Sequence, residues 1–245
     1  MVLNLSVLRA IKKLSKFLNH NLAGAIALVG SGEYLPQAQA LESELLRLAI
    51  SRGKSNIFIQ IPTAAGREGA DSLNFWRSRG ADQGARIGCE VKYLPVLTRE
   101  DAHNLQWIED VGSAGLIYFS GGDPVHLADT FRDTPLWSAI VSAWKSGASL
   151  AGCSAGAMAF GGKIIGIRRS HISEGLKLLP DIEVIPHYDK FLGWLPDRVS
   201  AAIIRPDADK TLIGIDEDTA LVFTDVWRKY GRGKVHILRG SLEFS

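Results

Sequence analysis

The chain has 245 residues and a formal net charge of +2, and 46% of its residues are hydrophobic against 22% charged. A chain of this size can bury one good core, and its scattered charges exclude the strong field that would favour nucleic acid or an acidic lipid surface as a partner. Cys89 and Cys153 have neither a CxxC motif nor metal-ligand spacing. We therefore expect no disulfide framework, no metal site and a reducing, cytoplasmic location.

Residues 1–22 predict an amphipathic helix, with leucines and an isoleucine on one side and most of the basic residues on the other. Those basic residues interrupt the apolar core that a signal peptide needs, and no apolar run reaches the roughly 18 residues of a membrane span. The pattern leaves two interpretations open. The helix docks a partner, a second subunit of a homodimer or a membrane surface, or it lies on its own domain.

From Ala25 onward, short apolar runs alternate with amphipathic stretches, which indicates parallel strands joined by helices. The predicted strands cover residues 25–30, 56–61, 89–96, 114–123, 148–153, 181–187 and 211–218, and residues 234–240 predict an antiparallel edge. Helices are predicted around residues 41–48, 71–90, 137–144 and 192–203. The expected fold is a single α/β domain over residues 23–245, with a mostly parallel sheet between two layers of helices.

The stretch from Gly152 to Gly156, "GCSAG", follows a predicted strand and precedes a helix-forming stretch. This Gly-x-Ser-x-Gly pattern is typical of the nucleophile elbow, in which a strained turn projects the hydroxyl of Ser154 above the sheet. The helix after the turn directs free backbone N–H groups toward the reacting oxygen. A second glycine-rich strand end, "YFSGGD", could supply another such donor. The two motifs predict a site for acyl transfer.

These motifs, together with "GLKLLP", "IPHYDKF" and "IGIDEDTAL", resemble the serine peptidase family of dipeptidase E and cyanophycinase, whose fold is similar to that of class I glutamine amidotransferases. The resemblance implies amide hydrolysis without a cofactor. It implies Ser154 as nucleophile, His187 as general base and Glu217 as the carboxylate that orients the base. It also implies an oxyanion hole made by the backbone N–H groups of Gly122 and Ala155, with Gly121 as the close alternative to Gly122.

Other residues compete for these roles. His236 is the rival base because it follows the candidate acids, whereas the remaining histidines are expected to be solvated: His20, His103, His126 and His171. Asp216 and Asp218 flank Glu217, and if all three lay in a strand, Glu217 would face the side opposite to its neighbours. Glu174 is a further candidate acid, although a surface position suits it better.

Three polar residues near the motifs have a second interpretation. Cys153 would occupy the last strand position, with its side chain directed away from the site, so it is not the expected nucleophile. Asp123 suits the N-cap of the following helix. Glu33, in "GSGEY", leaves the first strand near the expected site, but Gly30-Ser31-Gly32 lacks the third glycine of a dinucleotide fingerprint, so no nucleotide is expected.

The leading hypothesis is a cytoplasmic serine peptidase that cleaves a short or isopeptide-linked peptide through an acyl-enzyme. Pro124 after "GGD" and "YDKFLGWLPDR" after His187 depart from the cyanophycinase pattern and argue against the cyanophycin polymer. Two interpretations are open for Lys190, Trp194 and Arg198: they form a pocket for a peptide carboxylate, or they lie on the surface of a helix.

Two alternatives remain. One is an α/β-hydrolase-type esterase that uses Ser154 and His236 with Asp209 or Asp225 as the acid. The other is a non-catalytic binding protein in which the N-terminal helix is the functional element.

Overall fold

A computed structural model describes residues 23–165, 172–191 and 210–245. The predicted N-terminal helix, the predicted helix around residues 192–203, His20, His171, Trp194, Arg198 and Asp209 lie outside these residues. No helix in the described ranges is long and apolar enough to cross a membrane. No group of three or more His, Cys, Asp or Glu side chains in the same ranges could hold a metal ion.

The centre of the molecule is a seven-stranded sheet with the order β11-β10-β1-β5-β4-β2-β3. The five strands β1, β5, β4, β2 and β3 run parallel to one another. At the edge next to β1, β10 pairs antiparallel with β1, and β11 pairs antiparallel with β10. The strands of this sheet are β1 (Ile26–Val29), β2 (Ile57–Ile61), β3 (Glu90–Tyr93), β4 (Leu116–Phe119), β5 (Ser149–Cys153), β10 (Thr219–Phe223) and β11 (Trp227–Gly231).

Both faces of the sheet are apolar because alternate residues of each strand enter different core clusters. In β1, Ile26 and Leu28 pack on one face, whereas Ala27 and Val29 pack on the other. Buried strands of this kind are expected where helices cover both faces of a parallel sheet. The helices are α2 (Gln39–Ile50), α3 (Ala70–Ile87), α4 (Ile108–Ser113), α5 (Pro124–Phe131), α6 (Pro135–Lys145) and α7 (Ala155–Phe160).

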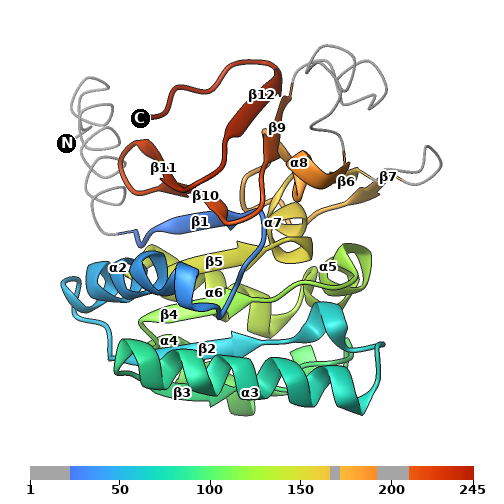
Figure 1. Cartoon of the computed structure of the whole chain (residues 1–245). Coiled ribbons are helices and arrows are strands. Elements are labelled where there is room, and N and C mark those ends of the chain that lie inside the picture. Colours follow the sequence, from blue (N-terminus) through green and yellow to red (C-terminus); the bar gives the residue numbers. More distant parts are fainter. Residues whose placement is uncertain (1–22, 166–171, 192–209) are drawn as a thin grey trace, which may run out of the picture.

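The helices α2 and α3 cover the face that carries Val29, and α4 to α7 cover the opposite face (Figure 1). This arrangement confirms the three-layer α/β fold with a mostly parallel sheet. Four 3-10 turns complete the connections: η1 (Pro36–Ala38), η2 (Thr63–Ala65), η3 (Asp101–His103) and η4 (Leu105–Trp107).

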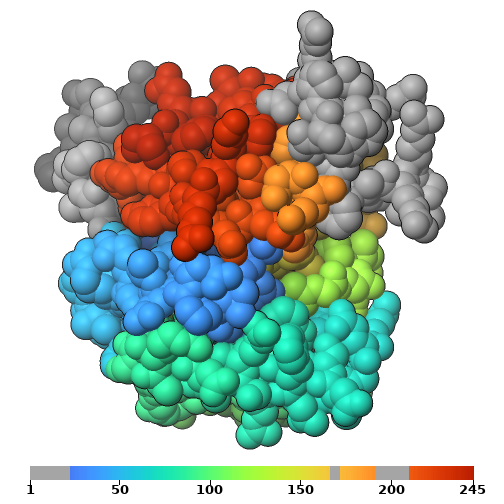
Figure 2. Space-filling model, viewed as in Figure 1, coloured from blue at the N-terminus to red at the C-terminus, as the bar shows by residue number. Residues whose placement is uncertain are grey.

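Three predicted strands lie outside the main sheet. The strands β8 (Ile182–Ile185) and β9 (Thr211–Ile215) run parallel to each other, and β12 (Val235–Arg239) pairs antiparallel with β9 in a separate three-stranded sheet. The antiparallel strand predicted at residues 234–240 is present as β12, but it lies at the edge of this smaller sheet; the antiparallel edge of the main sheet is formed by β10 and β11, which were not predicted. Residues 210–245 form one surface region beside residues 23–50 (Figure 2). Two short segments, β6 (Lys163–Ile165) and β7 (Ile172–Glu174), form a hairpin.

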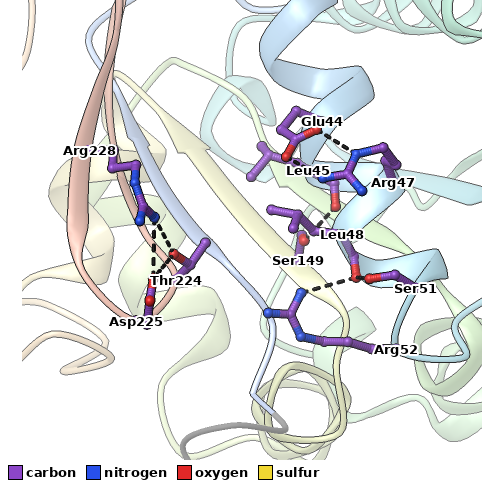
Figure 3. A network of polar contacts seen from close by, with 10 residues as sticks. All are labelled: Glu44, Leu45, Arg47, Leu48, Ser51, Arg52, Ser149, Thr224, Asp225 and Arg228. Carbon is purple, nitrogen blue, oxygen red and sulfur yellow. Dashed lines mark hydrogen bonds and ion pairs between the residues drawn. The ribbon is translucent and has the colours of Figure 1, made fainter. Parts of the chain in front are cut away.

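A polar contact joins α2 to the sheet at the amino end of β5, and others lie along the helix itself (Figure 3). The Ser149 hydroxyl at the start of β5 donates to the Leu45 carbonyl at 2.7 Å, a buried contact between strand and helix. The Arg52 guanidinium donates to the Leu48 carbonyl at 3.0 Å. Exposed ion pairs such as Arg47–Glu44 flank these contacts, and pairs of this kind contribute little to stability.

A buried carboxyl group lies under the first layer of helices. Glu42 of α2 has no exposed surface, accepts a hydrogen bond from the Tyr34 N–H at 3.2 Å and contacts the amide of Gln83. Burial raises the pKa of Glu42 from 4.5 to about 8, because it disfavours the ionised form. The folded chain therefore keeps this proton at pH values where the unfolded chain has released it.

We expect the free energy of unfolding to fall as the pH rises from about 5 to about 8, by an amount on the order of a few kcal/mol from this group. The sign follows because the folded state binds more protons than the unfolded state in that interval. Urea unfolding at several pH values measures it. The Glu42→Gln variant should lose this part of the pH dependence and be the more stable protein at pH 8. If the free energy of unfolding changed equally with pH in both proteins, Glu42 would not be the group responsible.

Candidate active site

The turn after β5 gives Ser154 an unusual backbone conformation, with φ 50° and ψ −107°, between the end of β5 and the start of α7. Both flanking glycines are required by close packing. A Cβ on Gly152 would lie 2.5 Å from the Gly156 carbonyl carbon, and a Cβ on Gly156 would lie 2.5 Å from the Phe119 oxygen in β4. The glycines therefore let the strand, the helix and β4 approach one another while a strained residue presents its hydroxyl.

The hydroxyl of Ser154 is hydrogen-bonded to a histidine. Ser154 Oγ lies 2.9 Å from His187 Nε2, and His187 Nδ1 lies 3.1 Å from Glu217 Oε1. Since a carboxylate only accepts, the proton belongs on Nδ1, and Nε2 is left to accept from the serine hydroxyl. All three side chains are partly exposed, so a substrate can reach them. This chain of hydrogen bonds has the order and spacing of a nucleophile, a base and an orienting acid.

Two loops of the smaller sheet carry the histidine and the acid. His187 follows β8 with φ 49°, and Glu217 lies in the turn between β9 and β10. The strands β8 and β9 are parallel neighbours, so their carboxyl ends meet at one edge. The interpretation of Glu217 as a strand residue is wrong, because β9 ends at Ile215. The direction of the Glu217 side chain is therefore set by the turn, and not by the alternation of side chains along a strand.

A second carboxylate, that of Asp189, connects the loop of His187 with the loop of Glu217. Asp189, in the short helix α8 (Tyr188–Phe191), accepts a hydrogen bond from the Glu217 N–H at 2.8 Å. The buried ring of Tyr188 packs against Gly214 of β9, where a Cβ would lie 2.6 Å from the ring. The segment that bears His187 is thereby held against the strand that leads to Glu217. In the sequence, Asp189 stood out only as part of the motif "IPHYDKF", and no role was predicted for it.

The turn after β4 lies beside the nucleophile. A Cβ on Gly121 would lie 3.9 Å from Ser154 Oγ, and the Gly121 N–H already donates to Glu33 Oε1 at 3.0 Å. Gly122 has φ 134°, and a Cβ there would lie 2.4 Å from the Ala64 backbone. Within the described part of the chain, the N–H groups of Gly122 and Ala155 donate no hydrogen bond. The Gly121 N–H is already engaged by Glu33, which leaves the N–H groups of Gly122 and Ala155 as the candidate donors to an oxyanion.

The alternative candidates lie in other environments. His236 Nε2 is 3.1 Å from Asp216 Oδ1, and its ring contacts the Tyr188 ring at a tilt of 43°, with centroids 4.4 Å apart. The Glu174 side chain is exposed and pairs with Lys177 at 3.1 Å, and the exposed Asp225 pairs with Arg228 at 3.2 Å. His103 is exposed and donates to the Arg99 carbonyl.

The expectation that His126 is solvated is wrong. This residue is buried on α5, and its Nε2 donates to the Leu97 carbonyl at 3.0 Å. The hydrogen bond satisfies the buried ring nitrogen. The interpretation of Asp123 as a helix N-cap is confirmed, because its carboxylate accepts from the Val125 and His126 N–H groups.

The model of peptidase family S51 matches residues 26–227. The chain belongs to this family. This S51 peptidase is 30% identical to a cyanophycinase of Trichormus variabilis over 212 residues, which cover 80% of this chain and 68% of that protein. It is 27% identical to a cyanophycinase of Geminocystis herdmanii over 231 residues, covering 89% and 82% of the two chains. The resemblance drawn from the sequence motifs is confirmed, and the protein is a serine-type peptidase.

Solved structures agree with this assignment. The S51 peptidase superimposes with a TM-score of 0.84 and 48% identity on a peptidase from an acI-B1 actinobacterium, over 92% of this chain and 94% of that one. A second solved structure, from Listeria monocytogenes EGD-e, is 17% identical with a TM-score of 0.61, and covers 86% of this chain and all of that one. At that identity, the likeness bears on the fold alone.

Proposed function

We propose that this S51 peptidase hydrolyses short or isopeptide-linked peptides through a Ser154–His187–Glu217 triad and an acyl-enzyme. The observation that carries the proposal is the unbroken hydrogen-bond chain of 2.9 Å and 3.1 Å from the serine hydroxyl to the carboxylate. A serine hydroxyl at its ordinary pKa is a weak nucleophile, and an imidazole within hydrogen-bond reach removes this limit by accepting the proton during attack.

In the first half of the reaction, Ser154 Oγ attacks the carbonyl carbon of the scissile amide while His187 Nε2 accepts the hydroxyl proton. The Glu217 carboxylate holds the ring by its Nδ1–H and stabilises the imidazolium that forms. The negative charge on the former carbonyl oxygen is stabilised by the free N–H groups of Gly122 and Ala155. His187 then protonates the leaving amine, and the acyl-enzyme remains.

In the second half, water takes the place of the leaving amine. His187 accepts a proton from this water as it attacks the ester, and returns the proton to Ser154 Oγ when the carboxylic acid leaves. Lys190 Nζ lies 3.7 Å from Glu217 Oε2 on an exposed side chain. It therefore contributes positive charge at the rim of the site, where a carboxylate group of a short peptide could be bound.

A substrate panel tests this function. Dipeptides, isoaspartyl dipeptides, the cyanophycin polymer and simple esters are offered to the purified full-length protein, and release of amine or alcohol is measured. We expect cleavage of dipeptides or isoaspartyl dipeptides, and little release from the polymer, since Pro124 and the segment after His187 depart from the cyanophycinase pattern. Cleavage of esters without any peptide, or efficient release from the polymer, would contradict the proposed substrate class.

A further inference from the structure

Glu33 joins three strand ends of the main sheet. It follows β1, its side chain is buried with 7% exposure, and each of its carboxylate oxygens accepts a different donor. Oε1 accepts from the Gly121 N–H at 3.0 Å, and Oε2 accepts from the Cys153 thiol at 2.8 Å. Gly121 belongs to the turn after β4, and Cys153 is the last residue of β5, directly before the nucleophile. One carboxylate therefore spans the two segments that frame Ser154.

The thiol acts here as a donor. Burial raises the pKa of Cys153 well above its ordinary value, and the nearby Glu33 carboxylate raises it further, so the sulfur keeps its proton. A neutral thiol can donate to the carboxylate, and a protonated, buried sulfur is a poor nucleophile. Cys153 thus anchors Glu33, whereas the Ser154 hydroxyl is hydrogen-bonded to His187.

The carboxylate also restricts the glycine turn. The Gly121 N–H is occupied by Glu33, and after Gly122 the Asp123 N–H donates to the Ala64 carbonyl at 2.8 Å. The peptide group between the two glycines is therefore held from both ends, and its N–H stays available to the reacting oxygen. Because oxyanion stabilisation depends on donors that are already in place, loss of one anchor should weaken it.

We propose that Glu33 is a positioning residue for the oxyanion hole, because its carboxylate bridges the Gly121 N–H and the Cys153 thiol and thereby fixes the turn that presents the Gly122 N–H. The inference rests on the proposed function. It predicts that kcat requires a hydrogen-bond acceptor of the right length at position 33, and that the negative charge of the side chain matters less.

The test compares Glu33→Ala, Glu33→Asp and Glu33→Gln in the full chain, using a peptide that the wild type cleaves. Glu33→Ala should lower kcat by about 10²–10³-fold, the size of a lost oxyanion donor, with KM within about threefold. Glu33→Asp keeps the charge but is one methylene too short to reach both donors, and should lose a large part of kcat. Glu33→Gln keeps the acceptor for Gly121 and should stay within about tenfold of the wild type.

Two measurements separate positioning from a general loss of structure. Thermal unfolding identifies any variant that fails to fold. If Glu33→Ala does not fold, the comparison of kcat between Glu33→Asp and Glu33→Gln tests the role of Glu33. A peptide trifluoromethyl ketone, which forms a tetrahedral adduct with the serine, should lose affinity in parallel with kcat. Glu42→Gln is the matched control, since it alters another buried carboxyl group that contacts neither Gly121 nor Cys153, and should leave kcat unchanged.

The outcomes distinguish this inference from the function on which it rests. The proposed function fails if a fluorophosphonate does not label Ser154. The role of Glu33 fails, with the function intact, if a folded Glu33→Ala protein retains kcat within threefold or changes only KM. It also fails if Glu33→Gln is as slow as Glu33→Ala, because the charge and not the acceptor would then matter.

Discussion

Replacing Ser154 with alanine is expected to lower kcat by about 10⁶-fold, while the folded structure is retained. The magnitude follows because the nucleophile, base and acid act as one unit, and removal of the attacking oxygen leaves the base nothing to activate. Alanine removes only the hydroxyl, and the backbone at φ 50° is kept by the packing of both glycines. Peptide hydrolysis at saturating substrate measures the loss.

Covalent labelling provides a second measurement of the same prediction. A fluorophosphonate should attach to Ser154 in the wild type and leave Ser154→Ala unlabelled. Cys153→Ala tests the neighbouring residue: it should still be labelled at Ser154, although more slowly, because the lost thiol is one of the two donors that hold Glu33. If Ser154→Ala kept hydrolytic activity within about tenfold, or if the label were found on Cys153, the nucleophile would be assigned wrongly.

The second large effect concerns the base. His187→Ala should lower kcat by a factor close to that of Ser154→Ala, about 10⁶, and the double variant should be no slower than either single one. Both hydrogen bonds of the triad pass through this ring, at 2.9 Å and 3.1 Å. Removing it leaves the Ser154 proton without an acceptor and Glu217 without its partner.

His236→Ala is the control that separates this arrangement from the esterase alternative. His236 contacts Asp216 and Tyr188. We expect its loss to reduce the melting temperature and to leave kcat within about tenfold of the wild type. Full loss of activity in His236→Ala together with an active His187→Ala protein would reverse the assignment of the base.

The sequence alone determined the layered α/β fold, because buried strands and amphipathic helices leave different periodicities in a chain. It also determined the position of the strained serine, since Gly152 and Gly156 mark a turn that only small residues can form. Both signals are local: each depends on residues that are near one another in the chain. The family motifs extended this information to His187 and Glu217.

Only the tertiary structure decided which side chains meet. Residues 154, 187 and 217 come together because β8 and β9 form a separate sheet whose following loops bring His187 and Glu217 to Ser154, whereas the sequence described them only as further strands. The hydrogen bond from the Glu217 N–H to Asp189, the pairing of His236 with Asp216 and the hydrogen bond from Cys153 to Glu33 each join residues 20 or more positions apart. Such contacts depend on strand order and loop direction, and periodicity carries no information about either.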